Sequence, residues 1–248
     1  MAGNSPVKPA LVIIVPCFNE AEAIPETAKT LSAKIRQLIS GEMVSPESSL
    51  LFVDDGSTDE SWSLIEKYQR KDPGVVSGIK LPENTGHQNA LLCALLSVKN
   101  KAGLTVTIDA DLQDDVDTID KMIDCYYSGS EVVCGVRSDR KCDGLLKRIS
   151  AWVFYRLMRF LGSGIIYNHA DFRLMSGKAV SALAEYCRAN GKNILLRCII
   201  PALGLKTTVV HYKRKKRMSG KSKYTLWKML KLAYNGLSSF AAVGKRRH

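Results

Sequence analysis

The residues best suited to chemistry stand together between positions 109 and 115. The segment Asp109-Ala-Asp111-Leu-Gln113-Asp-Asp115 holds four carboxylates within seven residues. Like charges this crowded destabilise a protein unless a cation neutralises them. Residues two apart on an extended chain point to the same side, so Asp109 and Asp111 can face one site. Oxygen ligands suit Mg²⁺ or Mn²⁺, held by one or two carboxylates and substrate phosphates. The alternative is an Asp-rich turn that caps a helix from Asp117.

Two further polar clusters, at 16–20 and 54–59, have residue types that could bind a ligand. The first reads Pro16-Cys-Phe-Asn19-Glu20, and the second reads Asp54-Asp55-Gly-Ser-Thr-Asp. A carboxylate at the end of a strand can accept hydrogen bonds from a ribose or a base. The alternative is a strand-to-helix turn with an N-cap. The glycine-rich fingerprints of P-loop and dinucleotide-binding proteins are absent from the sequence.

The elements that must position these clusters alternate along the first 136 residues. Short apolar runs predict strands at 10–15, 50–53, 75–81, 104–108 and 131–136. Helical spacing predicts helices at 22–39, 59–70, 86–99 and 117–127, the second of them capped by Ser57 or Thr58. Alternation of this kind indicates an α/β fold with a mostly parallel sheet, whose ligands sit beyond the carboxyl ends of the strands.

After residue 140 the pattern becomes more basic and less regular. We expect helices at 145–161, 177–186 and 224–240, strands at 170–175 and 206–212, and an apolar stretch at 193–203 around one arginine. Residues 186–248 hold 16 Lys or Arg and no acid, whereas residues 1–185 hold 20 against 24 acids, a net charge of −4. Such a basic block is expected to meet anions, such as lipid headgroups, nucleotide phosphates or nucleic acid. The alternative is a solvated basic surface.

Composition excludes several classes of protein. With 46% apolar residues and 18 Gly, the chain is neither disordered nor collagen-like. Seven Cys without a C-x-x-C pair predict reduced thiols in a cytosolic setting, with no disulfide framework and no structural zinc. The longest apolar run, 232–244, is too short to span a membrane. Because residues 1–9 are polar and the first apolar run is short, we expect no signal peptide.

Taken together and in order, the motifs resemble those of the family 2 glycosyltransferases with a GT-A fold. They are Pro-x-x-Asn-Glu at 16–20, Val-Asp-Asp-Gly-Ser-x-Asp at 53–59, Asn-x-Gly at 84–86 and Asp-Ala-Asp at 109–111. The resemblance covers about residues 10–140. It implies an inverting transferase that uses a nucleotide-activated sugar and a divalent metal. In that family Asp54 or Asp55 would hold the nucleoside, and Asp111 would bridge the metal to the diphosphate. The donor-binding residues implied are Pro16, Asn19, Glu20, Asp54, Asp55 and Asp109.

Three segments narrow the resemblance to the polyprenyl-phosphate glycosyltransferases of the dolichol-phosphate-mannose-synthase-like and bactoprenol glucosyltransferase types. They are the acidic motif, Asp-Phe-Arg-Leu-Met at 171–175 and Arg-Met-Ser-Gly-Lys-Ser-Lys-Tyr at 217–224. The resemblance now spans about residues 10–240. It implies that Mg²⁺ or Mn²⁺ binds to Asp111 and Gln113. The phosphate- and acceptor-binding residues implied are Arg137, Arg148, Arg197, Arg217, Ser222 and Lys223. The catalytic residues implied are Asp111, Asp171, Arg217 and Lys223.

For Asp171 and His87, a structural role is an alternative to a role in catalysis. Asp171 would position the acceptor or sugar hydroxyls, or it forms an ion pair with Arg173 or a neighbouring arginine. His87 is expected to cap the helix opened by Gly86 rather than to act in catalysis. Two segments depart from the relatives: Cys-Phe at 17–18 replaces a pair ending in Tyr, and Asp-Val-Asp at 115–117 replaces a Pro-Pro-Glu tail.

The expected organisation is a tail at 1–9, a GT-A catalytic domain at 10–213, and a basic loop with an interfacial helix at 214–248. Many relatives continue into two transmembrane helices, so the chain is expected to be either a soluble form or a truncation. The expected reaction moves a sugar from a UDP- or GDP-sugar to a polyprenyl phosphate at the cytoplasmic face of the membrane. The partners are then the nucleotide-sugar, the lipid phosphate and an anionic membrane surface, and a homo-oligomer stays open. Alternatives are a hydroxyl acceptor, a non-catalytic scaffold, and a basic nucleic-acid-binding protein, which the acidic motif and the few aromatics near the basic residues disfavour.

Overall fold

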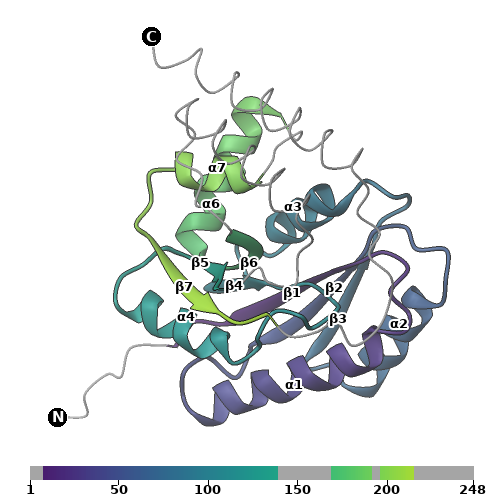
Figure 1. Ribbon diagram of the computed structural model, residues 1–248. Coiled ribbons are helices and arrows are strands. Elements are labelled where there is room, and N and C mark those ends of the chain that lie inside the picture. Colours follow the sequence, from purple (N-terminus) through teal and green to yellow (C-terminus); the bar gives the residue numbers. More distant parts are fainter. Residues whose placement is uncertain (1–7, 139–168, 192–195, 215–248) are drawn as a thin grey trace.

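The computed structural model describes residues 8–138, 169–191 and 196–214. Seven strands form one sheet with the order β3-β2-β1-β4-β6-β5-β7 (Figure 1). Strand β6 runs antiparallel to its neighbours β4 and β5, and every other pair is parallel. The predicted α/β fold with a mostly parallel sheet is therefore confirmed. The strands are β1 (Leu11–Cys17), β2 (Ser49–Asp54), β3 (Val76–Lys80), β4 (Leu104–Thr107), β5 (Val132–Arg137), β6 (His169–Ser176) and β7 (Thr207–Tyr212).

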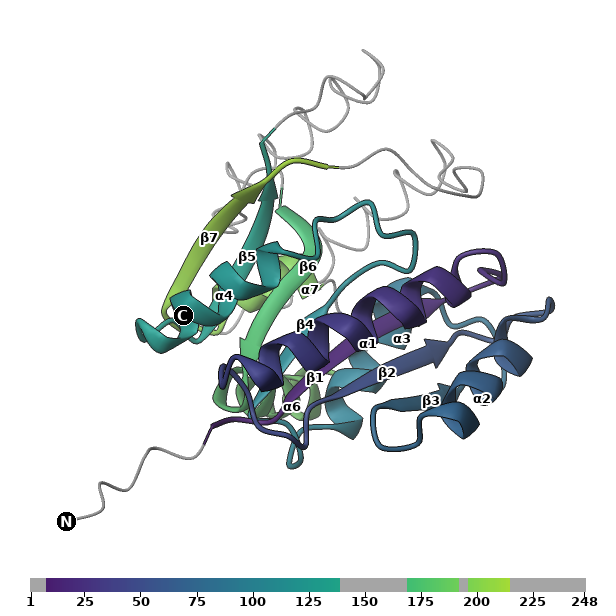
Figure 2. The same cartoon turned by 90° about the horizontal axis from the view of Figure 1, so that it is seen from below.

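Helices cover both faces of the sheet. One face carries α1 (Ile24–Ser40), α2 (Ser61–Lys71) and α4 (Thr118–Tyr127), which lie in front of the sheet in Figure 2. The other carries α3 (His87–Ser97), α6 (Gly177–Asn190) and α7 (Leu196–Ala202). The expected helices at 145–161 and 224–240, and the basic segment from residue 215 onward, lie outside the described residues.

The central strands are apolar throughout because they are buried on both sides. In β1, Leu11, Ile13 and Val15 pack in the core beneath α1, α2 and α4, whereas Val12 and Ile14 pack beneath α3 and α6. All five side chains are less than 9% exposed. Residues of one strand thus join two separate cores, and the sheet is held firmly between its helices.

Helix α1 buries two polar side chains that tie it to the acidic motif. Thr27 is fully buried, and its hydroxyl donates to the carbonyl oxygen of Ala110 at 2.6 Å. Lys34 is only 4% exposed, and its Nζ lies 2.7 Å from Asp117 and 3.0 Å from Asp120. Although burial opposes it, hydrogen bonds to these carboxylates raise the pKa of Lys34. Helix α1 is therefore fixed to both ends of the loop that follows β4.

The predicted cap of α2 is wrong. The helix begins at Ser61, and its N-cap Glu60 makes no side-chain capping bond. Ser57 and Thr58 instead bind the loop after β1: the Asn19 N–H donates to Ser57 Oγ at 2.9 Å, and the Thr58 N–H donates to Asn19 Oδ1 at 2.8 Å. Ser57 and Thr58 therefore do not cap the helix, because they hydrogen-bond to Asn19 in the loop after β1, whose backbone and side chain need partners.

Gly56 makes the turn after β2 possible. Its φ is +69°, and a Cβ there would lie 2.5 Å from the carbonyl carbon of Glu83. We expect Gly56→Ala to lower the free energy of unfolding by about 2 kcal/mol or more, measured by urea denaturation, because strain and a backbone clash add. Gly74→Ala is the matched control, since no atom lies within 4 Å of a Cβ there. It should change the stability by less than about 1 kcal/mol. Equal losses in the two variants would contradict this account of the turn.

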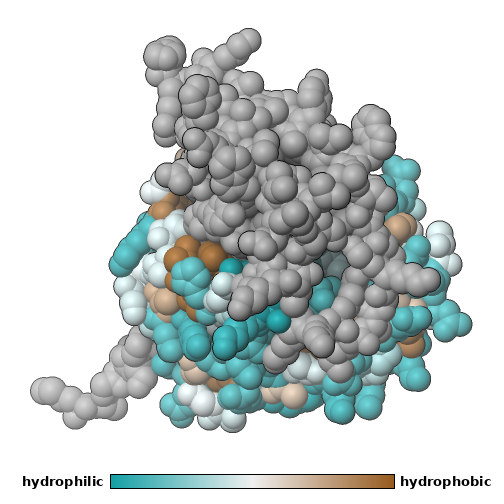
Figure 3. Space-filling model, in the orientation of Figure 1, coloured by the Kyte–Doolittle hydropathy of each residue, from teal (hydrophilic) through white to brown (hydrophobic). Residues whose placement is uncertain are grey.

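On the face shown in Figure 3, the described surface is mostly hydrophilic, with hydrophobic residues in small groups. Among the described residues, Tyr127 and Val209 are the large hydrophobic side chains that are exposed. No helix in the described ranges is long and apolar enough to cross a bilayer. Five cysteines are described as free thiols, as the sequence predicts for them: Cys17, Cys93, Cys125, Cys134 and Cys187.

Candidate active site at the carboxyl edge of the sheet

The predicted clusters meet at one edge of the sheet. Strand β1 pairs in parallel with β2 on one side and β4 on the other, and Cys17 stands opposite Asp54 in the register. The carboxyl ends of parallel strands lie at the same edge. The motif after β1, the Asp54 motif and the acidic motif after β4 are therefore neighbours in space. The prediction that the sheet brings them together is confirmed.

The loop after β1 is organised around Asn19. Its φ is +52°, a conformation that asparagine tolerates better than most residues. The N–H groups of Glu20 and Ala21 donate to Ser61 Oγ at 2.9 Å and to Asp59 Oδ2 at 3.2 Å. Together with the bonds of Asn19 itself, these contacts join the first two predicted donor-binding motifs into one rigid unit.

Asp54 and Asp55, which the sequence leaves as equal candidates, have different environments. Asp55 accepts from the N–H and hydroxyl of Thr85, both at 2.8 Å, and from the Gly86 N–H at 2.9 Å. It therefore anchors the segment that leads into α3. Asp54 is fully buried and accepts from the Ser57 N–H at 3.2 Å. Its Oδ1 has no hydrogen-bond partner among the described residues. Of the two, Asp54 keeps an acceptor for a ligand.

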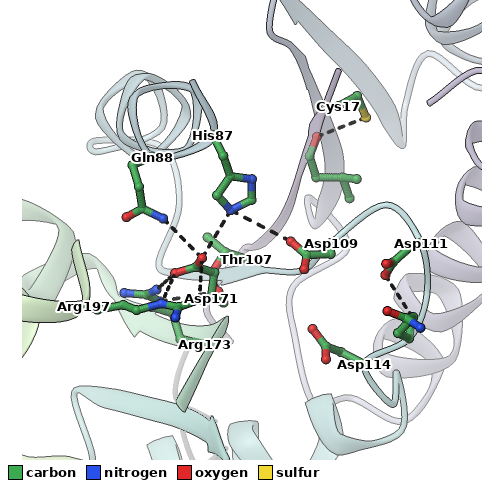
Figure 4. A network of polar contacts seen from close by, with 12 residues as sticks. Cys17, His87, Gln88, Thr107, Asp109, Asp111, Asp114, Asp171, Arg173 and Arg197 are labelled. Carbon is green, nitrogen blue, oxygen red and sulfur yellow. Dashed lines mark hydrogen bonds and ion pairs between the residues drawn. The ribbon is translucent and has the colours of Figure 1, made fainter. Parts of the chain in front are cut away.

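Cys17, beside Asp54, is not a nucleophile. Burial raises the pKa of its thiol well above the ordinary value, and the charges of Glu20 and Asp54 raise it further. The thiol therefore stays protonated at neutral pH, and it points toward the Val15 carbonyl, with Sγ 3.6 Å from that oxygen (Figure 4).

The acidic motif turns sharply after β4. Leu112 has a φ of +49°, and the Gln113 N–H donates to Asp111 Oδ1 at 3.2 Å. The Asp114 side chain is buried, and its Oδ1 accepts from the Tyr212 hydroxyl at 2.5 Å and lies 3.5 Å from Nη2 of Arg137. Arg137, predicted to bind phosphate, is thus held near the motif by a carboxylate and a phenol.

Several carboxylates act on Asp109 at this edge. Burial, together with the charges of Asp114, Asp171 and Asp111, raises the pKa of Asp109 to about 6, against the influence of His87. The buried Oδ2 of Asp114 has no hydrogen-bond partner among the described residues. Carboxylate and amide oxygens are ligands that Mg²⁺ and Mn²⁺ prefer, so these residues fit a divalent cation.

Within the described ranges, no three His, Cys, Asp or Glu side chains gather as a metal cluster. Mg²⁺ commonly uses one or two protein carboxylates together with substrate phosphates. Asp111 and Gln113 could therefore hold a cation whose other ligands come from a phosphate-bearing substrate.

Asp171 lies at the centre of a charged cluster on the other side of Asp109 (Figure 4). Its Oδ1 lies 2.5 Å from Nη2 of Arg173 and accepts from Nε of Arg197 at 3.2 Å. Its Oδ2 accepts from Nη2 of Arg197 at 3.0 Å and from Nε2 of Gln88 at 3.2 Å. His87 Nε2 adds a contact at 3.3 Å. Two oxygens thus face five donors, more than the roughly four positions that a carboxylate offers.

These partners keep Asp171 ionised. Burial alone would raise its pKa, but Arg197, the hydrogen bond from His87 and the charge of Arg173 hold it well below the ordinary value. A carboxylate so strongly stabilised as an anion is a poor proton acceptor at neutral pH. The contacts match the ion-pair interpretation of Asp171, whereas its predicted positioning of substrate hydroxyls stays a prediction.

The expectation that His87 caps α3 is wrong. Gly86 is the N-cap residue and no side chain caps the helix, so His87 is the first helical residue. Its imidazole instead turns toward Asp171 and lies 3.9 Å from Oδ1 of Asp109. Although burial opposes it, the contact with Asp171 raises the pKa of His87. The signal in the sequence is its position directly after the Asn-x-Gly motif at 84–86.

The predicted phosphate-binding residues divide into two groups. Arg137 extends from the end of β5, and Arg197 from the first turn of α7, where it forms a two-point contact with Asp171. The others lie outside the described residues, and their roles stay predictions: Arg148, Arg217, Ser222 and Lys223.

Comparison with known proteins places this geometry in a family. The model of "Glycosyl transferase family 2" matches residues 12–184. An uncharacterized glycosyltransferase of Bacillus subtilis, YkoT, is 47% identical over 94% of this chain and 68% of its own length. A prophage bactoprenol glucosyl transferase homolog of Escherichia coli is 36% identical over 92% of this chain and 71% of its own. A bactoprenol glucosyl transferase of Shigella phage SfX is also 36% identical, over 92% of this chain and 72% of its own length.

Solved structures share the fold at low sequence identity. Glucosyl-3-phosphoglycerate synthase of Mycobacterium tuberculosis, with Mn²⁺, UDP-glucose and phosphoglyceric acid, has a TM-score of 0.61 at 14% identity, covering 94% of this chain and 80% of its own. The mannosyltransferase PcManGT of Pyrobaculum calidifontis, with GDP-mannose and Mn²⁺, has a TM-score of 0.55 at 18% identity. The match covers 96% of this chain and 74% of the mannosyltransferase. The fold is GT-A-like, as predicted. The family match and the relatives show that this chain belongs to glycosyl transferase family 2.

Proposed function

We propose that this enzyme transfers a sugar, with inversion, from a UDP- or GDP-sugar to the phosphate of a polyprenyl lipid. The relatives named bactoprenol glucosyl transferase support the acceptor class, since they match 92% of the chain at 36% identity. The solved structures of similar fold in complex with UDP-glucose or GDP-mannose support a nucleotide-sugar donor.

The environment of Asp171 is the observation that favours a phosphate acceptor over a hydroxyl. A hydroxyl must lose its proton to a general base as it attacks. Asp171 is the buried carboxylate of the cluster, but two arginines already neutralise it and its pKa is well below the ordinary value. A phosphate monoester has a second pKa near 6, so it is already an anionic nucleophile at pH 7. Because Asp171 is paired with two arginines and is a poor base, the site suits a phosphate acceptor, which needs no general base.

Asp111 and Gln113 would hold the divalent cation. When bound, Mg²⁺ or Mn²⁺ would act as a Lewis acid that stabilises the charge of the leaving diphosphate. The carboxylates near Asp109, and the buried Oδ2 of Asp114 that has no hydrogen-bond partner among the described residues, support a cation at this edge. Neutralisation of this charge would return the pKa of Asp109 toward its ordinary range.

The other predicted site residues would bind the donor and its phosphates. Asp54 would accept a hydrogen bond from the nucleoside through its Oδ1, and Asp109 would bind the donor beside the cation. Arg137 stands next to Asp114 and would contact phosphate by a charge-assisted bond. Arg217 and Lys223 would add further phosphate contacts from the basic segment.

The basic C-terminal quarter would place the enzyme at the cytoplasmic face of an anionic membrane. Residues 186–248 carry 16 Lys or Arg without a compensating acid. Each Lys or Arg near an anionic surface contributes about 1 kcal/mol of attraction. This attraction would bring the edge of the sheet close to the lipid phosphate.

A thermal-shift panel of UDP, GDP and their common sugars, with and without Mn²⁺ or Mg²⁺, tests the donor. A ligand at about 100 times its Kd stabilises a protein by about 2.7 kcal/mol. We expect a metal-dependent rise in Tm with the sugars of one nucleotide. No shift with any nucleotide would contradict the donor assignment.

Asp54→Asn and Asp55→Asn form a matched pair for the same panel. Asp54→Asn should lose most of the donor-induced shift, with donor affinity reduced about tenfold, while the Tm of the free protein changes little. Asp55→Asn should lower the Tm of the free protein, because the loop before α3 loses its anchor, yet keep the donor-induced shift. The reverse pattern would assign the nucleoside contact to Asp55.

A further inference from the structure

His87 stands where the charged cluster meets the acidic motif. Its Nε2 lies 3.3 Å from Oδ2 of Asp171 and 3.9 Å from Oδ1 of Asp109. The Asp171 side chain is only 9% exposed, whereas those of His87 and Asp109 are 34% and 35% exposed. The same ring nitrogen of His87 thus contacts a buried carboxylate and a partly exposed one, and Figure 4 shows the imidazole between Asp171 and Asp109.

Both supports of His87 are rigid. Asp171 is fixed by Arg173, by the two-point contact with Arg197 and by Gln88. The Gln88 side chain also accepts from the Leu196 N–H at 3.2 Å, so α3 and α7 share this anchor. The start of α3 is fixed separately through the three hydrogen bonds of the preceding residues to Asp55. The position of His87 is thus fixed both by the backbone at the start of α3 and by the contact of its ring with Asp171.

Asp109 has fewer contacts among the described residues. It lies two residues after the end of β4, and no described side chain donates a hydrogen bond to its carboxylate. Among the residues that the structure describes, His87 is the only side chain that forms an ion-pair contact with it, at 3.9 Å. His87 is therefore the described side chain best placed to orient this carboxylate.

We propose that His87 is a positioning residue that, held by Asp171, keeps the Asp109 carboxylate in the orientation that binds the donor. This inference rests on the proposed function, in which Asp109 contacts the nucleotide-sugar. His87 acts through Asp109 and need not touch the donor itself. Because Asp109 would hold the donor in the ground state as well as in the transition state, loss of His87 should weaken donor binding more than turnover.

His87→Phe and His87→Gln test this role. Phenylalanine keeps a ring but removes the nitrogen that contacts both carboxylates, so the donor KM in sugar transfer should rise about tenfold, as should the Kd of the nucleotide-sugar in calorimetry. The kcat and the KM for the lipid acceptor should change less than about threefold. Glutamine offers an amide N–H at similar reach, so it should restore the donor KM to within about threefold of wild type.

Asn89→Ala is the matched control for damage to the start of α3. Asn89 lies in the same first turn, and within the described part of the chain its side chain donates only to the Thr85 carbonyl, at 2.8 Å. Its removal should leave the donor KM within about twofold of wild type. An unchanged donor KM and Kd in His87→Phe would overturn the proposal, as would equal effects of His87→Phe and Asn89→Ala.

The calorimetric readout separates this inference from the proposed function. If the wild-type chain binds a nucleotide-sugar but glycosylates no polyprenyl phosphate, the proposed acceptor is wrong, and the Kd series still decides the role of His87. If the wild-type chain binds no nucleotide-sugar, the proposed donor and the role of His87 fail together.

Discussion

Asp111→Ala is expected to abolish sugar transfer, with a fall in kcat of about a thousandfold or more. The carboxylate is the proposed protein ligand of a cation that stabilises the leaving diphosphate, and such stabilisation contributes several kcal/mol to the transition state. The measurement is the initial rate of transfer by the purified, folded variant at saturating donor and Mn²⁺. Metal removal by a chelator should reproduce the loss in the wild type.

Asp117→Asn controls for the loss of one negative charge from the same loop. Asp117 contacts Lys34, which keeps Asp120 as a second partner, and its side chain is 75% exposed. Its replacement should leave transfer within about threefold of wild type. Full turnover by Asp111→Ala would refute the assignment of Asp111 as a metal ligand.

Asp171→Ala is expected to destabilise the fold by about 3–5 kcal/mol while leaving residual transfer. It would strand Arg173, whose side chain is 1% exposed, in the core without its counter-ion. The Nη1 of that guanidinium already has no hydrogen-bond partner among the described residues, and the bond from its Nε to the backbone carbonyl of residue 171 supplies no counter-charge. Urea denaturation measures the loss of stability, and a transfer assay below the unfolding range measures the residual activity.

A surface ion pair gives the comparison for this loss. Arg36 pairs with Asp72 and is 57% exposed, so Arg36→Ala should cost less than about 1 kcal/mol. The double variant Asp171→Ala/Arg173→Ala should cost less than the sum of its single variants, because the stranded charge is then gone. An Asp171→Ala protein as stable as Arg36→Ala would show that the buried cluster does not stabilise the fold.

The same pair predicts how stability depends on acid. The pKa of Asp171 is lower in the folded protein than its ordinary value of 3.8, so its contribution is fully present above about pH 4. That contribution is lost as the pH falls through the lower, folded pKa. Asp171→Asn should therefore show a smaller loss of stability over that acidic range than the wild type.

The sequence predicts the sheet and the meeting of its motifs because both depend on local patterns. Apolar runs such as Leu11–Cys17 are buried on both faces, and parallel strands necessarily end at one edge. The start of α2 could not be predicted in the same way. Ser57 is a good capping residue by type, but Asn19, 38 residues earlier in the chain, donates to its hydroxyl instead.

The candidate site is predicted less completely, because its side chains choose partners far along the chain. Asp54 and Asp55 are adjacent and chemically identical, and only the loop at 84–86 distinguishes them by occupying Asp55. Gln88 and Asp171 are 83 residues apart, so nothing local to His87 indicates an anion beside α3. Motif spacing in the sequence identifies the residues that could bind a ligand. The packing of α3 and α7 determines which of these residues' carboxylates already have protein partners and which can still contact a ligand.

The acceptor specificity of sugar transfer distinguishes a lipid phosphate from a hydroxyl acceptor. The full chain is incubated with the donor that gives the thermal shift, with Mn²⁺ or Mg²⁺, and with anionic vesicles that contain either undecaprenyl phosphate or undecaprenol. Sugar should appear on the phosphate-bearing lipid alone, with its anomeric configuration inverted. Transfer to undecaprenol, with none to undecaprenyl phosphate, would contradict a phosphate acceptor.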